Sequence, residues 1–153
     1  MAALIRPVSY AEILSAPNAE RLMSDYAAEC SIPELGPINP QRELYAAMEQ
    51  SGAMQAFGVY EEGTLIGFMT VLIWTVPHYG KKIASTESIF LASERRDSGI
   101  GANMLQYIEE YAKGNDCAAI QYTAPVNSRF ARLLAINVDR YRRTNSIYLR
   151  NLA

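Results

Sequence analysis

The stretch ERRDSGIGANML, residues 94 to 105, decides the fold. It follows the β-rich segment 83–92 and leads into residues 98–114, where apolar side chains recur at helical spacing. Gly99 and Gly101 stand at the helix start, where each costs up to about 1 kcal/mol relative to alanine. A strand, a glycine turn and a helix start together present unpaired N–H groups at the positive end of the helix dipole, and such groups bind phosphate. The stretch therefore predicts an anion-binding loop.

Two common nucleotide-binding loops do not fit this stretch. A Walker loop needs Gly-Lys-Ser/Thr, whereas residues 101–103 read Gly-Ala-Asn. A dinucleotide fingerprint needs a third glycine where Met104 stands, and it normally follows the first strand of a domain. What remains is Arg-x-x-Gly-x-Gly, formed by Arg96, Gly99 and Gly101, between a strand and a helix.

The rest of the chain alternates between strand and helix patterns. Strands are expected over 3–10, 53–60, 64–76, 83–92, 117–124 and 146–152, and helices over 18–30, 40–52, 98–114 and 127–138. Ser98 and Asn127 are expected to cap the last two helices. This order predicts one α/β domain, residues 1–153, with a mixed sheet.

Composition and charge narrow the class of protein. The longest apolar run, residues 68–76, is too short to span a bilayer, so we expect a cytoplasmic protein without membrane contact. Cys30 and Cys117 lack metal-ligand spacing, so no metal site is expected. Residues 1–80 hold nine acids against three arginines, whereas residues 81–153 hold eleven bases against seven acids. The second half therefore suits an anionic ligand, but the acidic chain as a whole argues against nucleic acid.

Two segments together resemble a known family. They are TESIFLASERRDSGIGANML, residues 86–105, and CAAIQYTAPVNSRFARLL, residues 117–134. They are similar to the GNAT superfamily of acyl-CoA-dependent N-acyltransferases. The resemblance implies an α/β (α+β) fold with a mixed, mostly antiparallel central sheet flanked by helices. It also implies that the fourth and fifth strands splay apart to admit the pantetheine arm of acetyl-CoA, the cosubstrate.

The same resemblance assigns cofactor-binding residues. The strand segment formed by Ile89, Phe90 and Leu91 would pair with the pantetheine amides. Asn127 would contact the cofactor arm from the opposite side. The pyrophosphate would lie on the loop residues Arg95, Arg96, Asp97, Ser98, Gly99, Ile100, Gly101 and Ala102.

Transfer to an amine requires a general base. A primary ammonium with a pKa of about 10.4 is protonated at neutral pH and must lose a proton before it attacks a thioester. Glu87 is the first candidate, because the family often has an acid near the start of this strand. His78 is the alternative, in a turn that could instead shape substrate entry. A backbone N–H at Phe90 or Leu91 would serve as the oxyanion donor.

The general acid is less well defined. The family frequently uses a tyrosine after the asparagine-led helix, but Leu134, Ala135 and Ile136 stand at that place and no Gly-Phe follows. Tyr141 is the remaining candidate, and water is the alternative proton donor. Two functions therefore stay open: an N-acetyltransferase acting on a primary amine, or an acyl-CoA sensor or interaction module without catalysis.

Charge is the property that narrows the chemical class of the acceptor. The acidic first half favours a cationic amine, either a small molecule or a protein lysine or N-terminus. Tyr45, Phe57, Tyr60 and Trp74 are candidates for the wall of its pocket. The expected last strand, residues 146–152, is a possible contact in a homodimer.

Overall fold

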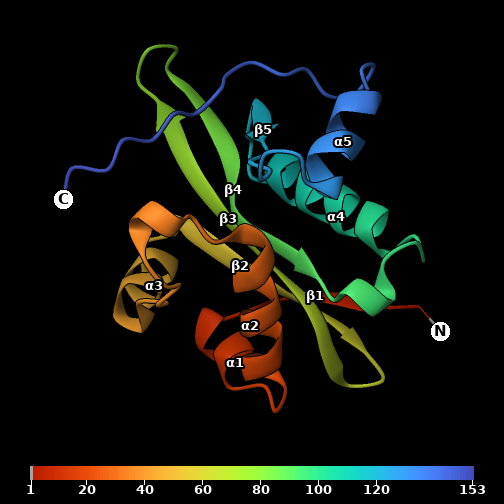
Figure 1. The fold of residues 1–153 in the computed structure, drawn as a ribbon. Helices are drawn as coiled ribbons and strands as arrows, with labels where there is room; N and C mark the ends of the chain where they lie inside the picture. Colours follow the sequence, from red (N-terminus) through yellow and green to blue (C-terminus); the bar gives the residue numbers. More distant parts are fainter. Residues whose placement is uncertain (1) are drawn as a thin grey trace.

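A five-stranded sheet forms the centre of the molecule (Figure 1). The computed structural model describes residues 2–153. The strand order β1-β2-β3-β4-β5 follows the chain; the first four strands are antiparallel, and β5 runs parallel to β4. The strands are β1 (Leu4–Val8), β2 (Met54–Glu61), β3 (Thr64–Val76), β4 (Lys81–Leu91) and β5 (Ala119–Gln121). The predicted fold class, a mixed and mostly antiparallel sheet flanked by helices, is confirmed.

Helices cover both faces of this sheet. The helices are α1 (Tyr10–Leu14), α2 (Ala19–Cys30), α3 (Arg42–Gln50), α4 (Ile100–Gly114) and α5 (Arg129–Ile136). Two short 3₁₀ turns, η1 (Pro33–Leu35) and η2 (Ser93–Arg95), lie in the connections. Among residues 2–153, none of the helices has both the length and the apolar character needed to cross a bilayer.

Alternation along β2 and β3 divides the core into two layers. Phe57 and Met69 point to one face and pack against Ile108 of α4. Ala56 and Phe68 point to the other face and pack against α1 and α2. The helices α1, α2 and α3 therefore share one side of the sheet, and α4 covers the other.

Short turns connect the antiparallel strands. Glu62 and Gly63, both with positive φ, close the β2–β3 hairpin that the sequence EEG predicts. Gly67 allows β3 to approach β4 closely, because a Cβ there would lie 2.6 Å from the Phe90 carbonyl oxygen.

Several local predictions are wrong. Residues 146–152 form no strand, and residues 137–153 contain neither helix nor strand. The alternating apolar pattern is present there, but a strand also needs a partner for its backbone groups, and Ile147 and Tyr148 lie exposed. The helix α1 was not predicted, because its five residues are too few to show a helical period.

The predicted helix caps are also wrong, each by one residue. Gly99, rather than Ser98, is the N-cap of α4, because the Ser98 hydroxyl donates to the Arg95 carbonyl oxygen at 2.5 Å. Ser128, rather than Asn127, caps α5, and its hydroxyl accepts from the Ala131 N–H at 3.0 Å.

Truncation of Ile108 tests the core between α4 and the sheet. Ile108 is fully buried, so Ile108→Ala is expected to lower the free energy of unfolding by about 2–5 kcal/mol. Lys113→Ala, at an exposed position of the same helix, is expected to change it by less than about 0.5 kcal/mol. Urea denaturation measures both values, and equal losses in the two variants would contradict this packing.

Candidate active site

The glycine loop lies between β4 and α4, as the sequence predicts. The backbone takes left-handed conformations at Asp97, with φ +67°, and at Gly99, with φ +84°. No side chain caps α4, so the first-turn N–H groups keep no side-chain acceptor. A Cβ built on Gly99 or Gly101 would meet no atom within 4 Å. The loop therefore leaves its amides open to a bulky anion.

Charged side chains on this loop tie it to three parts of the fold. One contact is with the backbone: Arg96 donates from Nε to the Leu91 carbonyl oxygen at 2.9 Å, which fixes the end of β4. The four ion pairs are Glu94 with Arg21, Arg95 with Glu61 at 2.7 Å, Arg96 with Glu29 at 2.8 Å, and Asp97 with Arg129. Both loop arginines already face carboxylates, so the backbone amides are the groups left to hold an anion.

Asp97 and Arg129 bring the start of α5 to this loop. The pair joins the residue two before Gly99 to the first residue of α5. Asn127 lies exposed two residues earlier, with φ +62°, and its carbonyl oxygen accepts from Arg132 at 2.7 Å. The structure therefore places Asn127 on the same side of the molecule as the glycine loop.

Asp97 gives a test of backbone strain in this loop. A positive φ costs an L-residue roughly 1–2 kcal/mol, whereas glycine adopts it freely. Both Asp97→Ala and Asp97→Gly lose the pair with Arg129, so they differ in this cost and in the larger chain entropy that glycine loses on folding, which is the smaller of the two at a positive φ. We expect the glycine variant to be more stable than the alanine variant by about 1 kcal/mol in urea denaturation. Identical midpoints would show that the loop relaxes around Asp97.

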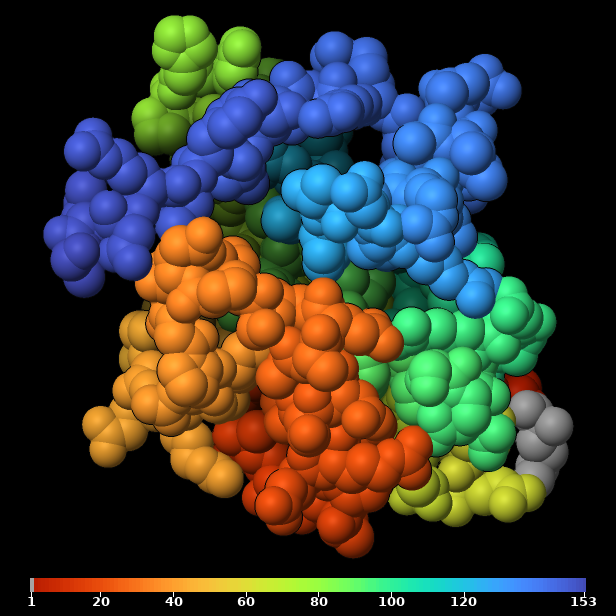
Figure 2. All heavy atoms as spheres, viewed as in Figure 1, coloured from red at the N-terminus to blue at the C-terminus, as the bar shows by residue number. Residues whose placement is uncertain are grey.

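The edge of β4 is open beyond its short pairing with β5. The two strands pair only at Ile83, Ala84 and Ser85, and beyond them the Thr123 N–H reaches the Thr86 hydroxyl at 3.3 Å. The segment containing Ile89, Phe90 and Leu91 keeps β3 as its partner on one side. Figure 2 shows a hollow in the surface of the molecule, between the orange helices and the blue C-terminal part, with green strand atoms at its floor.

Glu87 lies in a bulge of β4 at this open segment. Thr70 pairs with Ser88, and Val71 pairs with Thr86, so Glu87 is the extra residue between them. Its carboxylate accepts from the Tyr45 hydroxyl at 2.8 Å and from the Thr70 hydroxyl at 2.5 Å. The bulge therefore aims the carboxylate toward α3 rather than into the strand ladder.

Two buried hydroxyl groups, of Thr70 and Ser88, continue the hydrogen bonding of this carboxylate into the sheet. The Thr70 and Ser88 hydroxyl oxygens lie 2.6 Å apart, and both residues are buried. Because Thr70 has one proton and donates it to Glu87, Ser88 donates to Thr70. The order Ser88, Thr70, Glu87 fixes the carboxylate and leaves its remaining lone pairs for a proton.

Three tyrosines, Tyr10, Tyr26 and Tyr45, form a layer beside Glu87. The rings of Tyr10 and Tyr45 stack with centroids 3.8 Å apart, and the Tyr26 ring packs edge-on against Phe90 at 5.9 Å. Burial, followed by the nearby Glu87 carboxylate, raises the pKa of Tyr45 far above its ordinary value. Burial is also the main cause of the raised pKa of Tyr26. Both hydroxyls therefore stay protonated at neutral pH and act as donors.

Comparison with known proteins agrees with this geometry. The sequence of residues 19–134 matches the Acetyltransferase (GNAT) family. The chain belongs to this family. Among curated protein sequences, none matches this one.

Solved structures share the fold at low sequence identity. A ribosomal-protein-alanine N-acetyltransferase from Brucella melitensis biovar Abortus is 18% identical, with a TM-score of 0.72 over 98% of this chain and 99% of that one. An aminoglycoside acetyltransferase from an uncultured soil sample, solved with trehalose, is 12% identical, with a TM-score of 0.75 over 99% and 97%. An aminoglycoside antibiotic 6'-N-acetyltransferase from Acinetobacter baumannii is 18% identical, with a TM-score of 0.65 over 97% of each chain.

In this GNAT chain, His78 lies far from Glu87. It is exposed at the tip of the β3–β4 hairpin, where its ring packs edge-on against Tyr79 at 5.1 Å. Glu87 lies six positions along β4 from Lys81, which stands at the base of the tip, and this corresponds to about 20 Å. The structure therefore does not bring the two candidate bases together.

Tyr141 lies against α4. Its hydroxyl donates to the Glu109 carboxylate at 2.8 Å, and Tyr122 donates to the same oxygen at 2.9 Å. Burial, together with Glu109, raises the pKa of Tyr141 to about 12. Its proton is thus directed at Glu109 rather than at the open edge of β4.

The expected acceptor-wall aromatics also lie apart from one another. Tyr45 contacts Glu87, whereas Phe57 is buried under α4, on the other face of the sheet. Trp74 donates to the Ser85 hydroxyl at 3.0 Å. The sequence did not indicate Thr70, because a threonine in an apolar strand gives no local signal of a contact 17 residues away.

Glu109 gives the fold a predictable acid sensitivity. Burial alone would raise its pKa, but the donors Arg140, Tyr141 and Tyr122 outweigh it, so the pKa of Glu109 is lowered. A lowered folded-state pKa stabilises the fold above the unfolded pKa of about 4.3, and this contribution is lost as the pH falls through the folded pKa.

We therefore expect Glu109→Gln to lower the free energy of unfolding at pH 7 by roughly 1 kcal/mol, with a smaller difference from wild type near pH 3. Urea denaturation across this range measures it. Glu110→Gln, an exposed neighbour, is the control. A Glu109→Gln effect that is the same at both pH values would contradict the lowered pKa.

Proposed function

We propose that this chain is an acetyl-CoA-dependent N-acetyltransferase that acetylates a primary amine in the cytoplasm, with residues 1–153 acting as one domain. The observation that carries the proposal is the position of Glu87, in a bulge beside the open edge of the strand that leads to the glycine loop. Family membership and the N-acetyltransferases among the structural neighbours support it.

The residues present fit acetyl-CoA. The uncapped first turn of α4 offers N–H groups to a pyrophosphate, and no Cβ at Gly99 or Gly101 blocks the approach. The unpaired edge of β4 at Ile89, Phe90 and Leu91 offers backbone groups to the amides of a pantetheine arm. When bound, acetyl-CoA supplies the acetyl thioester. Among residues 2–153, no three His, Cys, Asp or Glu side chains gather as a metal site.

Glu87 accepts the proton that the ammonium of the acceptor must lose, directly or through water. Thr70 and Tyr45 hold the carboxylate in place during this step. The Ala92 N–H donates to Ile66 of β3, so by alternation along the strand the Phe90 N–H also faces β3 and the Leu91 N–H faces the open edge. The Leu91 N–H is therefore the donor to the carbonyl oxygen of the acetyl group as negative charge develops there. The departing thiolate takes its proton from solvent, because the Tyr141 hydroxyl donates to Glu109.

Cofactor binding tests the loop. Calorimetric titration with acetyl-CoA is expected to show binding by the wild type and at least about tenfold weaker binding by Gly99→Trp, since the indole would cover the amides. Gly80→Trp is the matched control, because Gly80 also has a positive φ and open space around it but lies at the β3–β4 tip. A wild type that does not bind acetyl-CoA would overturn the proposal.

Turnover tests the role of Glu87. Glu87→Gln is expected to keep acetyl-CoA affinity while the rate of thiol release with an amine falls by about 10²-fold or more. Release at the wild-type rate would exclude Glu87 as the base. Binding without release by the wild type, over a broad set of amines, would favour the sensor or interaction module instead.

A further inference from the structure

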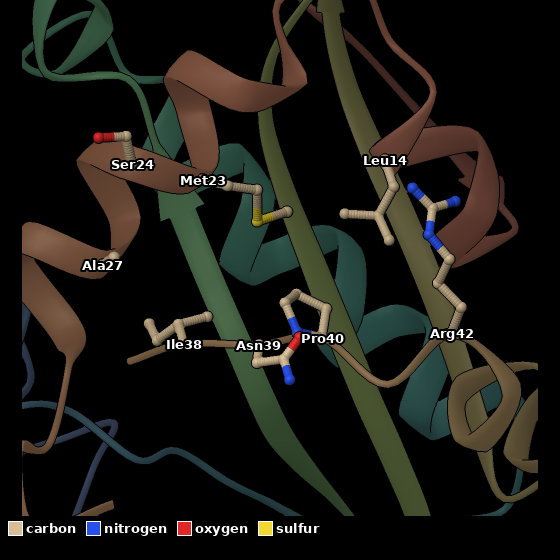
Figure 3. Close-up of a pocket in the computed structure, with 8 residues that line it drawn as sticks. All are labelled: Leu14, Met23, Ser24, Ala27, Ile38, Asn39, Pro40 and Arg42. Atoms are coloured by element: carbon tan, nitrogen blue, oxygen red, sulfur yellow. The ribbon is translucent and has the colours of Figure 1, made fainter. Parts of the chain in front are cut away.

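A pocket of about 400 Å³ opens on the face of the sheet that carries α1, α2 and α3. Figure 3 shows Leu14 and Arg42 extending toward it from α1 and α3, and Met23 extending toward it from α2. The loop before α3 closes it with Ile38 and Pro40. Its lining is thus mainly apolar and comes from three separate segments of the chain: α1, α2, and residues 38–42, which lead into α3.

Helical spacing places this pocket next to the tyrosine layer that lies beside Glu87. On each of the three helices, one residue that lines the pocket lies three or four positions, about one turn, from a tyrosine of the layer beside Glu87. The pocket therefore borders the tyrosine layer, and Tyr45 of that layer donates to the Glu87 carboxylate. These pairs are Leu14 with Tyr10, Met23 with Tyr26, and Arg42 with Tyr45.

Arg42 sets the charge of the pocket. It is the only charged residue among the eight that line it. Among residues 2–153, no carboxylate lies within ion-pair distance of its guanidinium. An exposed guanidinium beside apolar side chains is a good site for the carboxylate or phosphate of a ligand that also buries an apolar body.

None of the acids of the first half lines this pocket. Several of them already have partners outside the pocket: Glu12 with Arg6, Asp25 with Arg21, Glu29 with Arg96, Glu61 with Arg95, and Glu49 with the Tyr10 N–H. No Asp or Glu is among the eight residues that line the pocket, so the acidic composition that favours a cationic acceptor does not place a carboxylate in its lining.

We propose that this pocket selects the acceptor: a primary amine at one end of an apolar body that carries an acidic group at the other end. The inference rests on the proposed function. The apolar body lies among Leu14, Met23 and Ile38, the acidic group pairs with Arg42, and the amine reaches Glu87 past Tyr45. Such an acceptor differs from the polycationic aminoglycosides named for two of the structural neighbours.

Three amines of equal length test this selection. They are ε-aminocaproate, hexylamine and hexamethylenediamine, which end in a carboxylate, a methyl group and an ammonium. With wild-type protein and acetyl-CoA, kcat/KM for thiol release is expected to fall at least about tenfold from the carboxylate to the methyl compound. It is expected to fall further for the diamine, whose second ammonium faces Arg42. Equal values, or a preference for the diamine, would overturn the proposal.

Variants of Arg42 identify the group responsible. Arg42→Ala is expected to bring the ratio of kcat/KM for ε-aminocaproate and hexylamine close to one, and Arg42→Glu to favour the diamine. Arg142→Ala, an exposed arginine of the C-terminal segment, is the control and should keep the wild-type ratio. A ratio unchanged by Arg42→Ala would overturn the assignment to Arg42.

Direct binding separates this proposal from the catalytic one. In the presence of CoA, calorimetric titration should show ε-aminocaproate binding at least about tenfold tighter than hexylamine, and Arg42→Ala should remove the difference. This result, with no thiol release over the same broad set of amines, would uphold the pocket and overturn the transferase. Thiol release with no such difference in binding would uphold the transferase and overturn the pocket.

Discussion

The three-residue pairing between β4 and β5 is the constraint on which the rest of the site depends. The strands are joined only at Ile83, Ala84 and Ser85, so the following half of β4 has a neighbour on one side alone. Unpaired backbone groups at an edge need a partner, and a ligand with amides can supply it. The glycine loop continues from this same edge, so the strand and the start of α4 form one continuous binding surface.

The bulge at Glu87 connects this surface to the opposite group of helices. In a regular ladder Glu87 would alternate with its neighbours, but the extra residue turns its carboxylate toward Tyr45 of α3 and Thr70 of β3. Ion pairs also join the segment that follows β4 to α2, through Glu94 with Arg21 and Arg96 with Glu29. The Glu87 carboxylate therefore lies between the edge of β4, where we propose that acetyl-CoA binds, and the helices beside which we propose that the amine binds.

The parts of the site that were predictable from sequence are those encoded locally. Gly99 and Gly101 interrupt a helix start, and Glu87 lies in a strand that leads to them, so the loop and the acid follow from neighbouring residues. The contact between Tyr45 and Glu87 spans 42 residues and depends on how α3 packs, which no local pattern reveals. Residues 146–152 show the reverse case: the strand pattern is present, but no partner strand pairs with it. Tyr141 is a similar case: a tyrosine is present near the expected place, but its hydroxyl donates to Glu109, a contact that spans 32 residues.

Hydrogen exchange of the backbone amides in residues 86–91 tests the central claim most directly, because it observes the open edge of β4 itself. On addition of acetyl-CoA, the account predicts that amides in this segment and in the first turn of α4 exchange more slowly, while those at the β3–β4 tip do not change. Protection elsewhere, with residues 86–91 unaffected, would show that the open edge is not the cofactor site and would contradict the account.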